Sequence, residues 1–340
     1  MTTQQRDVAQ VAADSGIDVP ALVERVESLL LGGPRKYDRA AVAQRSGVSP
    51  DNARRLWRAL GFATVDDDDV VFTDGDVRAL SRTEFLAQHG IDDEELLTAM
   101  TRMLGQTFSR LAQWQGQLMI ELLGSRPELL SSEDEMVRFI EELLPVLEEL
   151  QTFVWRRQLA AYFSRITSQS DAEVAVTGAA PCVVGFADMA GFTTLTRRAT
   201  EAELRELLEA FESVSTEVVG SHNGRIVKAL GDEVLFVADS IDDGAEIALT
   251  LLDAAASDPR LPALRIGLAA GPVLGRMGDV YGSTVNIASR LTSISRPGWI
   301  LIDRVMAEAL RDDKRYSLRS RRPESVRGFH HLHQWRLKRA

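Results

Sequence analysis

The chain has 340 residues, 45% of them apolar, which is enough for two domains with buried cores. Its single cysteine, Cys182, excludes a disulfide framework, and neither a signal peptide nor an apolar run of roughly 18–20 residues is present, so a cytoplasmic protein without membrane spans is expected. The net charge of −11 is uneven, because residues 1–170 carry 18 Lys and Arg against 27 Asp and Glu, and this disfavours a nucleic-acid surface there.

The first half of the chain is predicted to be an all-helical domain over residues 1–165. Helical spacing of apolar residues begins at residues 19–32 and stops at Gly-Gly-Pro. Residues 36–62 resemble a helix-turn-helix, with two short helices around SGVS. Two long amphipathic helices follow over about residues 92–165, and each opens on an acidic turn that the helix dipole favours.

The helix-turn-helix resemblance raises the question of DNA binding. Its second helix offers Arg54, Arg55 and Arg58, but the run VDDDDV follows directly and repels phosphate. A module used for packing is therefore the favoured interpretation, and nucleic acid is not an expected partner. The long helices could alternatively enclose a lipid ligand, although a plain helical core is favoured.

The pattern of the sequence changes after residue 166. The segment TSQSDAEVAVTGAA lacks large apolar side chains, and residues 166–178 are interpreted as a linker. Short strands then alternate with helices over residues 179–340, and the chain closes with a short C-terminal pair of strands. This order predicts an α+β domain with a hairpin around LGDE.

Two carboxylates lie at the ends of predicted strands. The run PCVVGFADMAGFT delivers Asp188 at the end of a buried strand, and GRIVKALGDEVLFV places Asp232 at a hairpin tip. Each residue alone is better explained as a turn-forming Asp. Together they could hold divalent cations, while the loop MAGFT offers backbone N–H groups to phosphates.

The segment DVYGSTVNIASRL places Asn286 and Arg290 four residues apart, hence on one face of a helix. Alone, this is also the polar face of an ordinary amphipathic helix. However, FADMAGFT, VKALGDEVLFV and DVYGSTVNIASRL, in this order, resemble the catalytic domain of class III nucleotidyl cyclases over roughly residues 178–340. The resemblance implies a ferredoxin-like core and the conversion of ATP to 3′,5′-cyclic AMP and pyrophosphate.

The resemblance also implies a role for each matching residue. Two divalent cations, Mg²⁺ or Mn²⁺, would be held by Asp188, Asp232 and the backbone carbonyl of Met189. The loop residues at the triphosphate would be Gly191, Phe192 and Thr193. Asn286 and Arg290 would stabilise the transition state of in-line attack by the 3′-hydroxyl on the α-phosphate.

Base selection is implied by Lys228 and Asp279. Lys228 can donate to N1 of adenine and Asp279 can accept from its 6-amino group, whereas guanine presents the opposite pattern. Arg327 is the residue expected to contact phosphate near the C-terminus, although Phe329 replaces a second Lys found in some relatives. ATP is therefore the expected substrate.

The order of an acidic helical domain before this catalytic domain is similar to actinobacterial adenylate cyclases. That resemblance implies an N-terminal domain that restrains the catalytic pair in response to pH, with the linker as the bistable element. The class III resemblance of the catalytic domain implies a homodimer with active sites between subunits, in which one subunit gives the metal aspartates and the other the base-reading and transition-state residues. The titrating groups are left open between His89, His222 and the acidic clusters. The alternative function is a DNA-binding regulator whose cyclase-like domain senses nucleotide.

Overall fold

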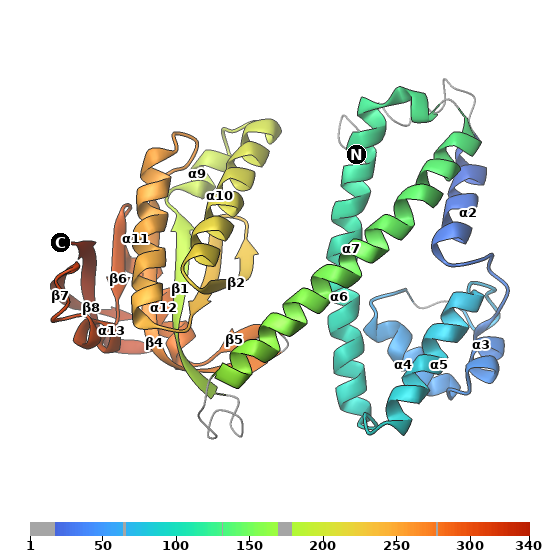
Figure 1. Ribbon diagram of the computed structural model, residues 1–340, viewed down its shortest axis with the longest axis horizontal. Coiled ribbons are helices and arrows are strands. Elements are labelled where there is room, and N and C mark those ends of the chain that lie inside the picture. The colour runs from blue at the N-terminus through green and yellow to red at the C-terminus, as the bar shows by residue number, and fades with distance from the viewer. Residues whose placement is uncertain (1–17, 64–65, 131, 169–178, 277) are drawn as a thin grey trace. The chain divides into compact units, whose positions relative to one another are not determined.

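The computed structural model describes residues 18–63, 66–130, 132–168, 179–276 and 278–340. The chain divides into two compact units, Met1–Ser164 and Arg165–Ala340 (Figure 1). Residues 166–168 of the predicted linker are the last residues of a helix, and its remainder, 169–178, lies outside the described residues. Within the described ranges, no helix is both long and apolar enough to cross a membrane.

The first unit is helical throughout its regular elements. Local sequence signals set the helix ends: the side chains of Asp38 and Ser49 cap two helices, and Gly47, at a φ of 76°, ends the first of them. The elements in chain order are α2 (Val19–Leu30), α3 (Arg39–Ser46), α4 (Pro50–Ala59), α5 (Asp74–Gln88), α6 (Glu94–Ser125), η1 (Pro127–Leu130) and α7 (Glu133–Ser168).

The helix-turn-helix module, α3 and α4, is held by carboxylates of its own unit. Asp67, in the acidic run after α4, forms an ion pair with Arg39 and lies 3.7 Å from a terminal nitrogen of Arg54. Arg55 pairs with Glu94 at the start of α6. Two of the three arginines that suited phosphate contacts are therefore engaged internally, which disfavours the DNA-binding alternative.

The long helices α6 and α7 carry large aromatic side chains that remain exposed within this unit. Trp114, Phe153 and Trp155 are 59%, 60% and 62% exposed. Such apolar surface is typical of faces that contact another protein. A cavity between α2 and α7 is lined by charged residues such as Glu24, Arg25 and Glu141, which do not suit an acyl chain, and a lipid ligand stays a prediction.

The second unit is a mixed sheet covered by helices on both faces. Its strands run in the order β2-β3-β1-β4-β6-β8-β7, with β5 paired to β4, and β4–β6 is the parallel pair. The elements in chain order are β1 (Ala179–Met189), α9 (Phe192–Thr196), α10 (Glu201–Ser221), β2 (Gly224–Leu230), β3 (Glu233–Ala238), α11 (Ile241–Ser257), β4 (Leu264–Arg276), β5 (Asp279–Tyr281), α12 (Ser283–Ile294), β6 (Trp299–Ile302), α13 (Arg304–Ala309), β7 (Tyr316–Val326) and β8 (Phe329–Arg339). This arrangement confirms the predicted α+β class and the ferredoxin-like core, which runs β1-α10-β2-β3-α11-β4.

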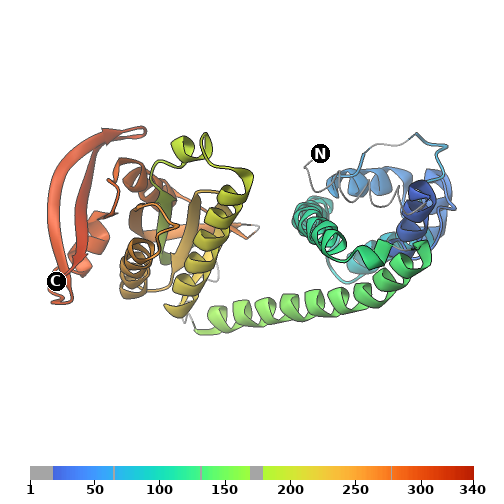
Figure 2. The same ribbon diagram turned by 90° about the horizontal axis from the view of Figure 1, so that it is seen from above.

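The two faces of the sheet have separate apolar cores. Helices α10 and α11 lie side by side on one face (Figure 2), where Phe211 and Phe236 are fully buried. Helix α12 covers the other face, where Phe186 packs with Ala288. Gly267 of β4 permits this approach, because a Cβ there would come within 2.3 Å of the Thr292 backbone nitrogen.

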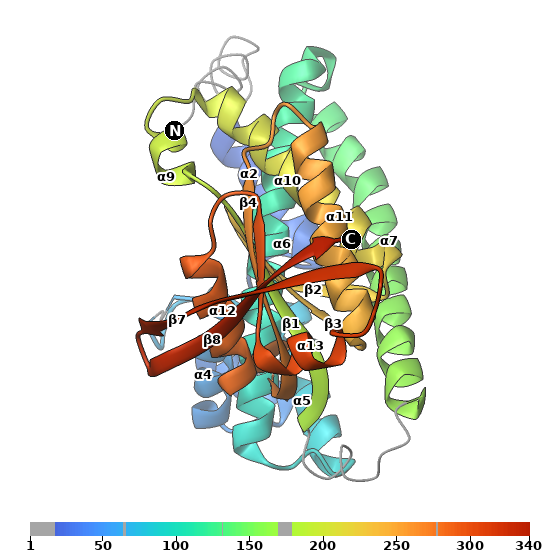
Figure 3. The ribbon, with the colours of Figure 1, turned by 90° about the vertical axis from the view of Figure 1, so that its left-hand side faces the viewer.

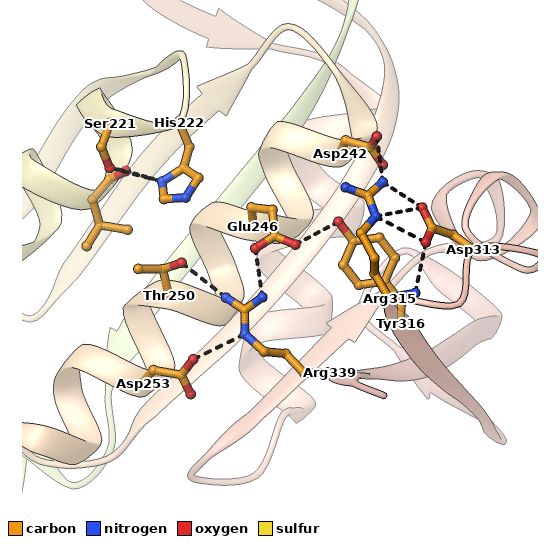
Figure 4. A network of polar contacts seen from close by, with 11 residues as sticks. Ser221, His222, Asp242, Glu246, Thr250, Asp253, Asp313, Arg315, Tyr316 and Arg339 are labelled. Carbon is orange, nitrogen blue, oxygen red and sulfur yellow. Dashed lines mark hydrogen bonds and ion pairs between the residues drawn. The ribbon is translucent and has the colours of Figure 1, made fainter.

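The C-terminal hairpin of β7 and β8 is longer than the short pair expected from the sequence, with 11 residues in each strand. The polar stretch RRPESVRG, where the two strands meet, lacks the apolar alternation from which a strand is predicted. Hydrogen bonds and ion pairs join one face of the hairpin to α11 (Figure 4). Arg339 donates to Glu246 at 2.8 Å, and the Tyr316 hydroxyl donates to the same carboxylate at 2.8 Å.

Candidate active site

Asp188 and Asp232 are brought together by the β1–β3 pairing. Asp188 is the next-to-last residue of β1, and by strand alternation its side chain lies on the α12 face, as that of Phe186 does. Asp232 occupies the turn between β2 and β3, after Gly231 at a φ of 68°. The Met189 N–H donates to the Asp232 carbonyl at 2.9 Å, so the two aspartates are joined through their backbones.

Arg265 is a member of this site that sequence reasoning missed. It stands opposite Asp188 in the β1–β4 register and donates to Oδ2 of Asp188 from Nε at 2.8 Å and from a terminal nitrogen. Burial raises the pKa of Asp188, the charge and hydrogen bonds of Arg265 oppose that rise, and the charge of Asp232 adds to it. The guanidinium therefore limits the rise in the pKa of this half-buried carboxylate.

Glu233 adds a third carboxylate, opposite Asp188 in the β1–β3 register. Burial raises the pKa of Glu233, and the charges of Asp188 and Asp232 raise it further. Crowded carboxylate oxygens of this kind are the donors that Mg²⁺ and Mn²⁺ prefer, and a cation would relieve their repulsion. Among the described residues, no three His, Cys, Asp or Glu side chains are arranged as a ready metal site, so the divalent cations that the family resemblance implies would rest on the carboxylates of Asp188 and Asp232.

The loop after β1 presents backbone rather than side chains. Met189 is fully buried in the core, so only its backbone can take part in the site. Gly191, at a φ of 79°, precedes the short helix α9. Phe192 packs against the core, and Thr193 is exposed. An anion could thus approach this turn without meeting a large side chain.

Lys228 and Asp279 form a direct pair, with Nζ of Lys228 at 2.6 Å from Oδ2 of Asp279. A bulge between Ile226 and Lys228 reverses the alternation, so Lys228 stands opposite Leu235 on the α12 face. Burial alone would raise the pKa of Asp279, but the hydrogen bonds from Lys228 and from the Val280 N–H outweigh it and lower that pKa. A donor and an acceptor are therefore fixed side by side.

Asn286 and Arg290 lie on the outward face of α12. The opposite face buries Thr284 and Ala288 against the sheet, so the amide of Asn286 is exposed and Arg290 is half-buried. Arg327 is exposed in the turn between β7 and β8, next to Gly328 at a φ of 88°. Within the described ranges, no hydrogen bond or ion pair joins these side chains to the Asp188 or Lys228 groups.

The predicted site residues thus form separate groups on this unit: the carboxylates with Arg265, the Lys228–Asp279 pair, the α12 pair and Arg327. No local sequence signal marks Arg265, since it lies 77 residues from Asp188 along the chain. The alternation of apolar residues around Arg265 predicted a strand but no role for Arg265 in the site.

Comparison with known proteins covers both units. Residues 174–339 match the family described as adenylate and guanylate cyclase catalytic domain, and residues 9–153 match the adenylate cyclase regulatory domain. An adenylate cyclase of Streptomyces coelicolor is 46% identical over 302 residues, covering 88% of this chain and 77% of that protein. An adenylate cyclase of Streptomyces griseus is 44% identical, covering 85% and 72%. A pH-sensitive adenylate cyclase of Mycobacterium tuberculosis is 28% identical, covering 80% and 69%.

Proposed function

The chain belongs to the class III adenylate cyclase family. On that premise we propose a role for each group of site residues in the conversion of ATP to cyclic AMP and pyrophosphate. The single observation that carries the proposal is the joining of Asp188 and Asp232 at one end of the sheet, through the 2.9 Å hydrogen bond from Met189. The charge of Asp232 also acts on the pKa of Asp188, which supports two carboxylates close enough to serve one metal-bound triphosphate beside the 189–193 turn.

The carboxylates of Asp188 and Asp232 are the groups that would hold two divalent cations, with the Met189 carbonyl as a further oxygen. When bound, such cations activate the ribose 3′-hydroxyl and neutralise charge on the triphosphate. Arg265 would orient the carboxylate of Asp188 through its hydrogen bonds to Oδ2, while the same carboxylate would help to hold a cation. Backbone N–H groups of the 191–193 loop face the phosphates.

Adenine selection falls to the Lys228–Asp279 pair. The pair holds one donor and one acceptor side by side, and adenine offers an acceptor at N1 and a donor at its 6-amino group. Guanine, with the opposite pattern, would leave both groups unsatisfied. The ammonium of Lys228 has three donors and the carboxylate of Asp279 has several acceptor positions, so each group can contact adenine while their own hydrogen bond is kept.

Asn286 and Arg290 are proposed to act on the substrate bound by a second copy of the chain. They point away from the unit's own core, and no contact within the described ranges joins them to Asp188. A homodimer with sites between subunits brings the two groups together. Arg290 then donates to the charge that develops on the α-phosphate, Asn286 orients the ribose, and Arg327 contacts phosphate.

Regulation by the N-terminal unit is proposed from its match to the adenylate cyclase regulatory domain and from the relative named as pH-sensitive. The exposed aromatic side chains of α6 and α7 support a contact with another protein chain. The helix α7, which ends at Ser168, is the element through which such a contact would reach the catalytic unit.

The test of the proposed function is the conversion of ATP to cyclic AMP by the full chain with Mn²⁺. Asp188→Asn and Asp232→Asn are each expected to lower kcat by about 10³-fold or more, because each removes a metal-binding charge. Asp312→Asn, an exposed aspartate outside the site, is the matched control and should retain activity. Full activity in Asp188→Asn with an intact fold would refute the assignment.

A further inference from the structure

The two faces of the C-terminal hairpin differ in whether their arginine side chains form ion pairs with carboxylates. On the α11 side, Arg315 and Arg339 are paired with carboxylates, among them Asp313 and Glu246 (Figure 4). On the α12 side, Arg319, Arg321 and Arg336 enter none of the ion pairs found among the described residues. Positive charge is therefore compensated on one face and left without a counter-charge on the other.

The uncompensated face is built around one indole ring. The guanidinium carbons of Arg336, Arg321 and Arg296 lie 3.9, 5.0 and 5.1 Å from the centroid of the Trp299 ring. Trp299 and Arg336 are half-buried, and the buried Nε of Arg336 has no hydrogen-bond partner in the described part of the chain. Indole contacts stabilise cations, but they do not satisfy guanidinium N–H groups.

Charge crowding at this cluster is reflected in the lowered pKa of Arg336 and in the local composition of the sequence. Burial lowers the pKa of Arg336, and the positive charges of Arg321 and Arg319 lower it further. Residues 296–340 carry 12 Lys and Arg against five Asp and Glu, in a chain of net charge −11. The acid of β7, Glu324, accepts from Gln334. A multivalent anion would relieve this repulsion.

The sheet register places the cluster beside the metal-binding aspartates. Asp188 stands opposite Arg265, and Arg265 stands opposite Trp299 in the next strand. Neighbouring strands are about 4.8 Å apart, so Trp299 lies about 10 Å from Asp188 along the row. Trp299 is also on the α12 face, where it packs with Ile294 (the hairpin beside it is the dark red ribbon of Figure 3).

We propose that Arg296, Arg321 and Arg336, arranged around Trp299, form a binding site for a di- or triphosphate group. Planar guanidinium groups donate paired hydrogen bonds to phosphate oxygens, and three of them match the charge of pyrophosphate. The inference rests on the proposed function, because the proposed reaction releases pyrophosphate at Asp188, two strands away from Trp299. The phosphate chemistry has two sources, the released pyrophosphate and the phosphate tail of ATP.

The experiment is equilibrium dialysis of the full chain against labelled pyrophosphate, and separately against ATP, in EDTA. Arg321→Gln/Arg336→Gln is expected to weaken pyrophosphate binding by about tenfold or more. Arg322→Gln/Lys314→Gln loses the same charge from exposed positions outside the cluster and should match the unaltered protein. If ATP binding weakens equally, the site takes the phosphate tail; if only pyrophosphate binding weakens, it is a product site.

Further variants keep the inference open to refutation. Arg296→Gln alters an exposed side chain and is expected to weaken pyrophosphate binding by about two- to fivefold even if the double variant misfolds. Asp188→Asn should keep metal-free pyrophosphate binding, so failure of the proposed cyclase chemistry and failure of this site are separable. Pyrophosphate binding that is unchanged in both arginine variants would overturn the proposal, and a changed oligomeric state in them would indicate an acidic protein surface as the partner instead.

Discussion

Arg265 and Asp188 stand opposite each other on neighbouring strands, and the Nε of Arg265 donates to Oδ2 of Asp188 at 2.8 Å. Burial raises the pKa of Asp188, and Arg265 is what opposes the rise. A carboxylate must be ionised to hold a metal, so metal affinity falls as the pH falls through this pKa.

Replacing Arg265 should therefore move the acid limit of metal binding. In Arg265→Gln the opposing charge is lost, the pKa of Asp188 rises further, and Mn²⁺ binding is lost at a higher pH than in the unaltered protein. Electron paramagnetic resonance of Mn²⁺ across pH 4.5 to 8 measures the shift. Arg276→Gln, at the exposed end of the same strand, is the control. An unshifted or acid-shifted limit would show that Arg265 does not hold Asp188 ionised.

Base selection can be tested on the Lys228–Asp279 pair. Lys228→Met/Asp279→Asn removes both charges together, so no unpaired charge remains, and the ATP to GTP ratio of kcat/KM is expected to fall by about 10²-fold or more. The exposed pair of Arg304 and Glu308 on α13, joined at 2.7 Å, supplies the control double variant Arg304→Met/Glu308→Gln. Retained ATP preference in Lys228→Met/Asp279→Asn would place base selection elsewhere.

The core against α10 and α11 depends on a glycine of β1. A Cβ at Gly185 would lie 2.2 Å from the ring of Phe236, which is fully buried and cannot move aside. Gly185→Ala should lower the free energy of unfolding by about 1–3 kcal/mol. Gly220→Ala, on the open side of α10, should raise it by about 0.5–1 kcal/mol. Urea unfolding of both variants compares the two, and equal stabilities would contradict the packing argument.

Local signals made part of the site predictable from the sequence. A few consecutive residues predict the buried strand that ends near Asp188, and a few others predict the glycine turn that carries Asp232. The helical spacing of Asn286 and Arg290 is equally local. The α+β order and the helical first unit followed from the same kind of periodicity.

Other features depend on pairing between distant strands. The face on which Lys228 lies is decided by a bulge, which strict alternation would not predict. Arg265 and Trp299 become neighbours of Asp188 only through the sheet register. Apolar alternation marks only part of β7 and β8, in Tyr316 with Leu318 and in Trp335 with Leu337, and the rest of each strand is largely polar, so the sequence indicated only a short pair.

A buried carboxylate of the second unit gives a further prediction, on stability and pH. Asp303 is 6% exposed at the start of α13, and its side chain accepts from the Met306 N–H at 3.0 Å. Burial raises the pKa of Asp303 to about 6, against the partial opposition of backbone hydrogen bonds from Met306 and Ala270. The folded state therefore binds more protons than the unfolded state between about pH 4 and pH 6.

The free energy of unfolding should accordingly fall as the pH rises through that window and level off above pH 6. Asp303→Asn keeps a capping side chain but cannot titrate, so the stability difference between the unaltered protein and this variant is expected to change by about 3 kcal/mol between pH 4 and pH 7. Urea unfolding, monitored by hydrogen exchange in β6 and α13, measures this change in the stability difference. Asp258, whose pKa is lowered to about 2 by hydrogen bonds from Arg260, is the contrast, because its contribution changes only below about pH 5 and Asp258→Asn should add no slope above that pH. A stability difference for Asp303→Asn that stays constant over this range would mean that the carboxylate is ionised throughout.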